Sequence, residues 1–205
     1  MSSFQPIVII LLFVALAVAG GIVGSNWLAA RKIAQEAERR GWRYIMPKWI
    51  GWSRPTINIA GHTENGAIWE LRRIKSARQI QYSWRTYSAP LPYGSIQILP
   101  TGVDSSAGDQ KIKLREVCPN HAPWPAEFSL YTSHDQLANL IGPDLTDAMC
   151  RFPPHPQKGA LAMIRWEDGV LTITCFYEEG WEVIDRLVAF GEAFLKQAEG
   201  DLSAS

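Results

Sequence analysis

The longest apolar stretch of the chain lies near its start, where residues 6–24 carry no charged side chain. Residues 7–24 are eighteen in number, and a helix of that length covers roughly 27 Å, close to the hydrocarbon thickness of a bilayer. Ala17-Val18-Ala19 resembles a signal-cleavage site, but residues 1–5 lack the basic side chain of a secretory signal and the apolar run continues past Ala19. The pattern therefore predicts a retained membrane span.

Helical spacing continues beyond the span. Residues 25–40 are strong helix formers, and Gly41 follows at a position where glycine commonly ends a helix. Apolar side chains recur on one face of this segment, at Trp27, Ala30, Ile33, Ala34 and Ala37. We therefore expect one long helix over residues 7–40.

The rest of the chain alternates apolar and polar residues over short segments, as half-buried strands do. Asn65-Gly66 and Asp168-Gly169 are typical of tight hairpin turns and would each join two strands. Strands are predicted at residues 56–63, 67–74, 79–87, 94–99, 111–117, 127–131, 160–166 and 170–177.

Helices are predicted between and after these strands. Ser133 and Gln136 have the spacing of a capping box and would begin the first helix, and residues 143–151 would form the second. Residues 181–198 form an amphipathic helix with one apolar face. The chain is thus predicted to be α+β: an N-terminal transmembrane helix, then a single domain with an antiparallel sheet of hairpins packed against helices, including a C-terminal amphipathic helix.

These elements divide the chain into four segments. We expect a transmembrane anchor (1–30), a juxtamembrane basic helix and aromatic connector (31–53), a cytoplasmic α+β domain (54–199) and a flexible tail (200–205). Without the anchor about 175 residues remain, which is enough for one domain with its own core.

Charges beside the span predict its orientation. No basic residue precedes it, whereas Arg31, Lys32, Arg39, Arg40 and Arg43 follow it closely. The positive-inside rule then places the N-terminus outside and the domain in the cytoplasm, as a single-pass protein of a bacterial inner membrane. The cysteines, Cys118, Cys150 and Cys175, are odd in number and widely spaced, as expected of reduced thiols.

Charge is unevenly distributed although the net charge is zero. Residues 31–90 hold twelve basic and four acidic residues, and residues 100–205 hold eight basic and sixteen acidic ones. Attraction of the basic half to anionic headgroups explains this better than nucleic acid, for which no recognition motif is present. The predicted contacts with the membrane surface are Trp27, Arg31, Lys32, Arg39, Arg40, Arg43, Trp49 and Trp52. For the aromatic residues of 42–54, a place in the core of the domain is the favoured alternative.

Small residues recur within the span. Gly20 and Gly24 have small-xxx-small spacing, and Ala17 and Gly21 repeat it on a neighbouring line of the helix. Such spacing lets two membrane helices approach closely, so these residues are candidates for packing against another span or a second copy. Gly and Ala are common in membrane helices, and the spacing also has this plainer explanation.

Chemical motifs are weak. Ser133-His134-Asp135 are neighbours in sequence and cannot form a catalytic relay, and Cys118 and His121 lack the paired ligands of a zinc site. No phosphate-binding glycine loop occurs outside the span. We assign no catalytic, cofactor-binding or metal-binding residue, we identify no small-molecule substrate, and the balance of the sequence is against an enzyme.

The layout of the chain resembles a loose class of uncharacterised bacterial single-pass membrane-anchored proteins with a C-terminal α+β domain. The resemblance rests on the N-terminal span, the motif RRGWRY and the segments INIAGHTENGAIWEL and EFSLYTSHDQLANLI, and it ends with ALAMIRWEDGVLTITCFYEEGWEVIDRLVAFGEAF. It covers most of residues 36–198. It implies one domain and no assigned activity.

Two hypotheses of different classes follow. The first is a non-enzymatic accessory module that binds or stabilises another membrane protein or a membrane complex from the cytoplasmic face. The second is a membrane-tethered hydrolase acting on lipids or envelope precursors, which requires a pocket with convergent acids or histidines such as His121, His134 or His155. A third, weaker hypothesis is sensing of the lipid surface through residues 42–54.

Overall fold

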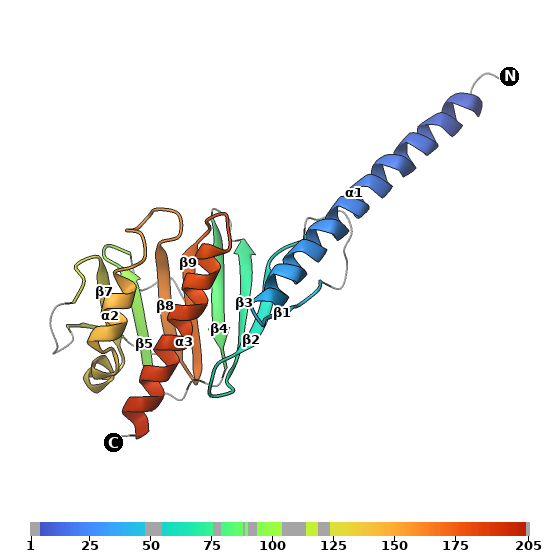
Figure 1. Ribbon diagram of the computed structural model, residues 1–205. Coiled ribbons are helices and arrows are strands. Elements are labelled where there is room, and N and C mark those ends of the chain that lie inside the picture. The colour runs from blue at the N-terminus through green and yellow to red at the C-terminus, as the bar shows by residue number, and fades with distance from the viewer. Residues whose placement is uncertain are drawn as a thin grey trace. The chain divides into compact units, whose positions relative to one another are not determined.

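The computed structural model describes residues 5–47, 55–75, 79–87, 89, 94–103, 114–118 and 124–203. Contacts between Cα atoms divide the chain into a first unit, Met1–Ala60, and a second unit, Gly61–Ser205. Figure 1 shows the long helix of the first unit and the sheet and helices of the second.

The first unit is built around one long helix, α1 (Gln5–Arg39), which confirms the predicted continuous helix. Gly41, at φ +73°, ends it as expected. The N–H of Gly41 donates to Glu38 O (2.9 Å) and that of Trp42 to Ala37 O (2.9 Å), which closes a Schellman turn. The chain then forms β1 (Arg43–Tyr44), which packs on α1 and pairs antiparallel with Ile59 and Ala60 of β2 (Asn58–His62).

The second unit contains the remaining strands of the sheet, and each pairs antiparallel with its neighbours. From one edge of these strands to the other the order is β3-β4-β9-β8-β5-β7-β6. Their bounds are β3 (Ile68–Lys75), β4 (Ile80–Thr86), β5 (Ser95–Pro100), β6 (Arg115–Val117), β7 (Phe128–Thr132), β8 (Leu161–Glu167) and β9 (Val170–Phe176). With the helices below, this confirms the α+β class.

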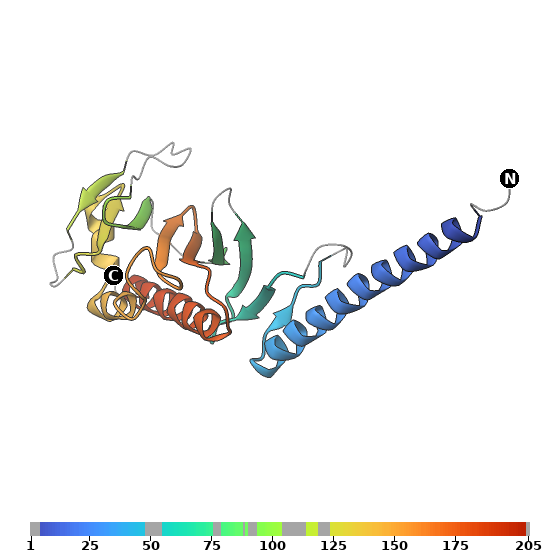
Figure 2. The same ribbon diagram turned by 90° about the horizontal axis from the view of Figure 1, so that it is seen from above.

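Helices lie on one face of this sheet. They are the 3₁₀ helix η1 (Asp135–Leu140), α2 (Pro143–Met149) and the C-terminal α3 (Glu182–Ser203). Figure 2 shows α3 and α2 on the same side of the strands, and among the described residues no helix covers the opposite face. The strands therefore have an inner face toward the helices and an open face.

Large aromatic side chains form the core between the sheet and α3. Trp69, Trp84 and Trp166 are fully buried. The ring of Trp166 meets that of Phe194 on α3 edge-on, with centroids 5.6 Å apart. Gly191 allows the backbone of α3 to approach Trp84 so closely that a Cβ there would lie 2.7 Å from the indole ring. Burial of these rings holds α3 on the sheet.

The two predicted hairpin turns have different outcomes. Asp168 and Gly169 both have positive φ (52° and 74°), as a two-residue I′ turn requires, and they join β8 to β9 as predicted. At the other turn, Gly66 N donates to Thr63 O and Thr63 N to Ala67 O, both at 2.9 Å. The loop is therefore Glu64-Asn65-Gly66, with Gly66 at φ +82°, and the prediction of a two-residue loop at Asn65-Gly66 is wrong by one residue.

The predicted capping box at Ser133 is also wrong. The Ser133 hydroxyl accepts the N–H of Ser95 (2.9 Å), and Ser133 N donates back to Ser95 O (3.0 Å), so this side chain joins β5 to the end of β7. The helix that follows is 3₁₀, and its N-cap is His134, which makes no side-chain capping bond. The Ser133 hydroxyl, which the local pattern predicts as a helix cap, instead makes a tertiary hydrogen bond with Ser95.

The remaining differences are one short strand and the ends of elements. Strand β1 was not predicted and lies within the expected connector, 31–53. Strand β6 occupies the end of predicted segment 111–117, and residues 111–113 lie outside the described residues. The C-terminal helix was expected to end at residue 198 but continues to Ser203, so much of the predicted tail, 200–205, is helical.

Candidate functional site

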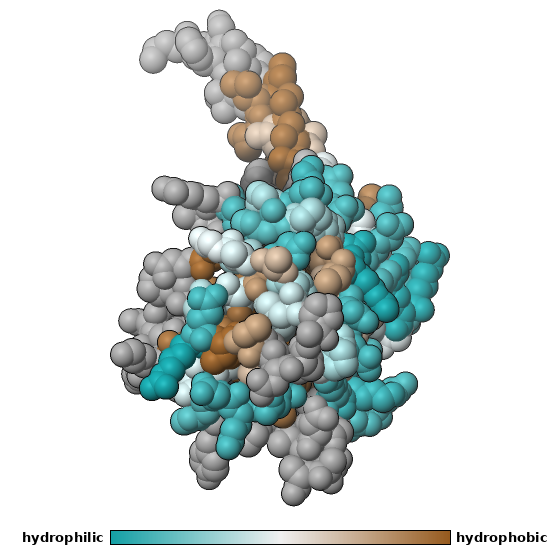
Figure 3. All heavy atoms as spheres, turned by 90° about the vertical axis from the view of Figure 1, so that its left-hand side faces the viewer, coloured by the Kyte–Doolittle hydropathy of each residue, from teal (hydrophilic) through white to brown (hydrophobic). Residues whose placement is uncertain are grey.

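The surface of α1 is apolar and open over most of its length. Leu11, Phe13 and Leu16 are 63%, 70% and 64% exposed. By length and composition, one described helix, over Ile9–Arg39, is able to cross a membrane, and an N-terminal signal sequence would have the same properties. Its exposure separates it from the core helix of a soluble domain. Figure 3 shows the contrast in hydropathy between brown side chains of the helix and the largely teal face of the second unit seen in that view.

The small residues of the span lie on an open surface. Ala17, Gly20, Gly21 and Gly24 are all exposed. A Cβ added at any of the three glycines would meet nothing within 4 Å. The surface that they form is free to receive another helix, and packing there stays a prediction.

The helix face predicted for residues 27–37 differs from the observed one only at its N-terminal end. Ala30 and Ala37 are fully buried as expected, but Asn26 is the buried residue one turn earlier, and Trp27 is 49% exposed. The Arg31 guanidinium lies over the Trp27 ring, 5.5 Å from its centroid. Trp27 and Arg31 are thus available together at the surface, which suits the headgroup region of a membrane.

The basic residues after the span are not equivalent. Arg39 and Arg40 both pair with Glu36, at 2.7 Å and 2.9 Å. Arg31, Lys32 and Arg43 are exposed and have no acidic partner within ion-pair distance in the described part of the chain. Of the predicted lipid contacts, Trp49 and Trp52 lie outside the described residues. The positive charge left for a membrane surface is therefore concentrated at Arg31, Lys32 and Arg43.

The connector offers one indication against lipid sensing by its described part. Tyr44, on β1, is half-buried, and burial raises the pKa of its phenol. Residues 48–54 lie outside the described part. The side chain of Tyr44 therefore belongs to the packing of the first unit.

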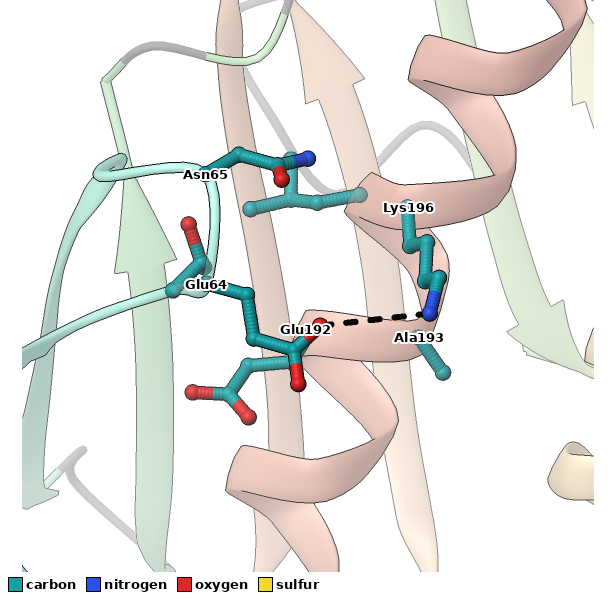
Figure 4. A pocket seen from close by; sticks show the side chains of 7 residues that line it. Glu64, Asn65, Glu192, Ala193 and Lys196 are labelled. Carbon is teal, nitrogen blue, oxygen red and sulfur yellow. Dashed lines mark ion pairs between the residues drawn. The ribbon is translucent and has the colours of Figure 1, made fainter.

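A hollow lies between the 64–66 loop and α3, where Figure 4 shows Glu64 and Asn65 facing Glu192 and Lys196. Its volume is about 180 Å³. Glu192 accepts the indole N–H of Trp69 (3.1 Å), and Lys196 Nζ lies 3.9 Å from Glu64 Oε2. Burial raises the pKa of Glu192, while the Trp69 hydrogen bond lowers it and the Glu64 charge raises it further. The small volume and single half-buried acid fit a contact between the loop and α3 rather than a substrate site.

The histidines of the hydrolase hypothesis do not meet in the described structure. His134 is the exposed N-cap of η1, and His155 is exposed with its ring against Phe176, at a centroid distance of 5.3 Å. His121 lies outside the described residues. Among the described residues no group of three or more His, Cys, Asp or Glu side chains could hold a metal ion.

Cys150 and Cys175 are not activated thiols. Cys175 is buried on β9, and burial raises its pKa to about 12. Cys150 is exposed, and desolvation followed by the charges of Glu127 and Asp147 raises its pKa as well. A nucleophilic cysteine requires the opposite shift. Cys118 and Cys150 are nevertheless exposed and useful as chemical labels.

The open face of the sheet carries arginines that sequence reasoning missed. Arg72 on β3 pairs with Glu70 at 2.5 Å, and Arg165 on β8 pairs with Glu167. Arg85 on β4 donates from Nε to Thr172 Oγ1 (3.1 Å) and lies over the Tyr87 ring, 5.9 Å from its centroid. Strand alternation in residues 68–75 and 80–86 already places these side chains opposite the buried tryptophans.

Comparison with known proteins gives a fold and no family. The chain matches no protein-family description and no curated protein. Among solved structures it is similar to the mycobacterial trehalose monomycolate transport factor A, TtfA, with a TM-score of 0.58 and 8% identity. The match covers 82% of this chain and 93% of that one. At this identity the likeness shows the shared α+β fold alone.

Proposed function

We propose that the protein is a non-enzymatic, membrane-anchored accessory module that binds or stabilises another membrane protein or membrane complex from the cytoplasmic face. The observation that carries this proposal is the exposed apolar surface of α1, which requires lipid or protein around it. The fold shared with a transport factor is compatible with an accessory role. His134 and His155 are both exposed, and this leaves the hydrolase alternative without support from the described residues.

Contacts with the membrane would be divided along α1. Apolar residues from Ile9 onward would lie in the hydrocarbon, and Trp27, Arg31 and Lys32 would lie at the cytoplasmic headgroups. Gly20 and Gly24 would pack against a span of the partner or of a second copy. Arg39 and Arg40 would contribute less than the sequence suggested, because they share Glu36.

The proposal is tested by isolating the full chain from native membranes in mild detergent. We expect it to migrate with a larger assembly, and we expect crosslinking to recover a membrane protein with it. A stable monomer that yields no crosslinked protein would refute the accessory role.

Orientation is tested with the exposed cysteines. A membrane-impermeant maleimide should label Cys118 and Cys150 only after the cells are permeabilised, and Cys175 only after unfolding. Labelling of Cys118 and Cys150 in intact spheroplasts would place the second unit on the outer side and overturn the cytoplasmic orientation.

A further inference from the structure

The exposed apolar side chains of the second unit are confined to one surface. Among its described residues, the large hydrophobic side chains that are exposed are Ile68 (56%), Ile74 (39%) and Tyr87 (56%). Trp69 and Trp84 point to the inner face, where Glu192 and Gly191 of α3 contact them. Because side chains alternate along a strand, Ile68 and Ile74 lie on the open face, as does Tyr87, which directly follows β4.

Polar residues of the same two strands complete this surface. Glu70, Arg72, Ile74, Ser83, Arg85 and Tyr87 line a shallow hollow of about 180 Å³. We refer to these residues together with Ile68 as the β3–β4 patch. Isolated exposed hydrophobic residues are ordinary, but here they flank two arginines on adjacent strands. Tyr, Arg and large apolar side chains are the residues that contribute most at protein interfaces.

The charges of the patch leave one cation available. Arg72 is compensated by Glu70. Arg85 has no carboxylate within ion-pair distance in the described part of the chain, and its Nε is held by Thr172 Oγ1. The Tyr87 ring lies under its guanidinium. A guanidinium fixed in this way can bind a carboxylate through its remaining N–H groups with little loss of side-chain entropy.

The geometry favours a protein segment as the occupant. The hollow is smaller than the roughly 300 Å³ at which small-molecule sites begin, and the neighbouring hollow between Arg85 and Arg165, at about 300 Å³, only just reaches that size. A lipid surface is a poorer match, because Arg72 and Arg165 are already paired with Glu70 and Glu167, and the single guanidinium of Arg85 is not a basic cluster that could bind a row of headgroup phosphates. An Asp or Glu next to an apolar side chain would satisfy Arg85 and cover Ile74 and Tyr87 together.

We propose that the β3–β4 patch is the surface on which the membrane-protein partner docks, through an acidic and apolar segment whose carboxylate binds Arg85. This inference rests on the proposed accessory function and names the part of the second unit that carries it out.

The test uses the full chain in native membranes with a photo-crosslinking amino acid at Ser83, inside the patch, or at Ala189, an exposed residue of α3. Ser83 should crosslink to one membrane protein within a segment that contains Asp or Glu, and Ala189 should not. Arg85→Glu and Tyr87→Ser should each lower the yield at least tenfold, whereas Arg151→Glu, an equal charge change at an exposed site, should not. Changing the crosslinked acidic residue of the partner to Arg should restore the yield with Arg85→Glu.

The outcomes separate this inference from the function on which it rests. If the partner comigrates with the wild type but the crosslink is unchanged by Arg85→Glu, the patch is not the docking surface and the accessory role stands. Crosslinks from Ser83 to lipid alone, or equal crosslinks from Ala189, overturn the inference too. If no other protein comigrates with the wild type, the accessory role itself is refuted. Circular dichroism of Arg85→Glu establishes that it folds, and Arg85→Gln replaces it in the comparison if it does not.

Discussion

Trp27 on α1 and Trp84 on β4 are the same residue type in opposite surroundings. Trp84 is fully buried against α3, and Trp27 is 49% exposed on a helix whose apolar side chains are exposed with it. In the second unit the hydrophobic effect closes a core, whereas the apolar side chains of α1 from Ile9 to Leu28 are mostly exposed and only the C-terminal part of the helix, at Ala30 and Ala37, is buried by protein. Apolar surface of that extent has to be covered by lipid or by another protein. The core of the second unit therefore stabilises the fold, whereas we expect the exposed apolar surface of α1 to determine where the protein is located.

Substitution of the two tryptophans tests this contrast most strongly. Trp84→Ala removes a buried ring from the core and should lower the free energy of unfolding by about 3–5 kcal/mol. Trp27→Ala should leave it within about 0.5 kcal/mol, because that side chain is outside the core. Urea unfolding of the full chain in detergent, followed by near-UV circular dichroism, measures both. Equal losses would show that α1 and the sheet do not differ in this way.

A charged residue placed in the span tests membrane insertion of α1 and not the stability of the fold. Leu12 is 57% exposed, and Leu12→Arg should raise the free energy of membrane insertion by about 3 kcal/mol. We expect much of this variant to leave the membrane fraction in carbonate extraction. Gln35→Arg, beyond the span on the same helix, is the matched control and should stay membrane-bound. Full retention of Leu12→Arg would contradict insertion of α1.

The close approach of the α3 backbone at Gly191 to the Trp84 ring predicts a smaller change in stability. Gly191→Val places a Cβ 2.7 Å from the Trp84 ring and should cost about 1–3 kcal/mol of unfolding free energy through overpacking. Ala189→Val adds the same side chain at an exposed position of α3 and should change stability by about 0.5 kcal/mol or less. If the two variants unfold at the same urea concentration, α3 does not pack on Trp84 as described.

The smallest effect concerns pH. Burial raises the folded-state pKa of Glu192, so its stabilising contribution is complete below the unfolded pKa of about 4.3 and is lost as the pH rises through the folded pKa. Glu192→Gln cannot ionise and retains an oxygen for the Trp69 N–H. It should be more stable than the wild type at pH 7, and the difference should shrink toward pH 4. Urea midpoints at both pH values measure this.

A matched variant separates Glu192 from a general charge effect. Glu179→Gln removes one negative charge at an exposed position. It should not reproduce the pH-dependent difference. A gap between Glu192→Gln and the wild type that is the same at pH 4 and pH 7 would argue against a raised pKa.

Local patterns predicted elements well and tertiary contacts poorly. The Asp168-Gly169 turn was predictable because positive φ at two successive residues depends on those residues themselves. Ser133 was misassigned because its hydroxyl binds Ser95, a partner 38 positions away. The placement of β5 between β8 and β7 likewise depends on pairings that no local segment encodes. Alternation of apolar and polar residues predicts which side chains of a strand are buried, but not which strands pair with it.

In the candidate site, too, local features could be predicted from the sequence and tertiary features could not. The i,i+3 and i,i+4 spacing of Glu36 with Arg39 and Arg40 was readable in the sequence and would have lowered the charge assigned to the membrane surface. The β3–β4 patch could not be identified in this way. Whether these residues are exposed depends on which face of the sheet α3 covers, and the local sequence does not specify that face.

The central claim is that the apolar helix remains part of the protein and holds it in the membrane. Intact mass measurement of the protein extracted from the membrane fraction tests this directly. We predict a mass that still includes residues 1–19, so that the whole apolar stretch of residues 6–24 is present in the membrane-bound protein. A product that begins after Ala19 and is found in the soluble fraction would show that the helix is a cleaved signal, and would contradict the anchor and the function built on it.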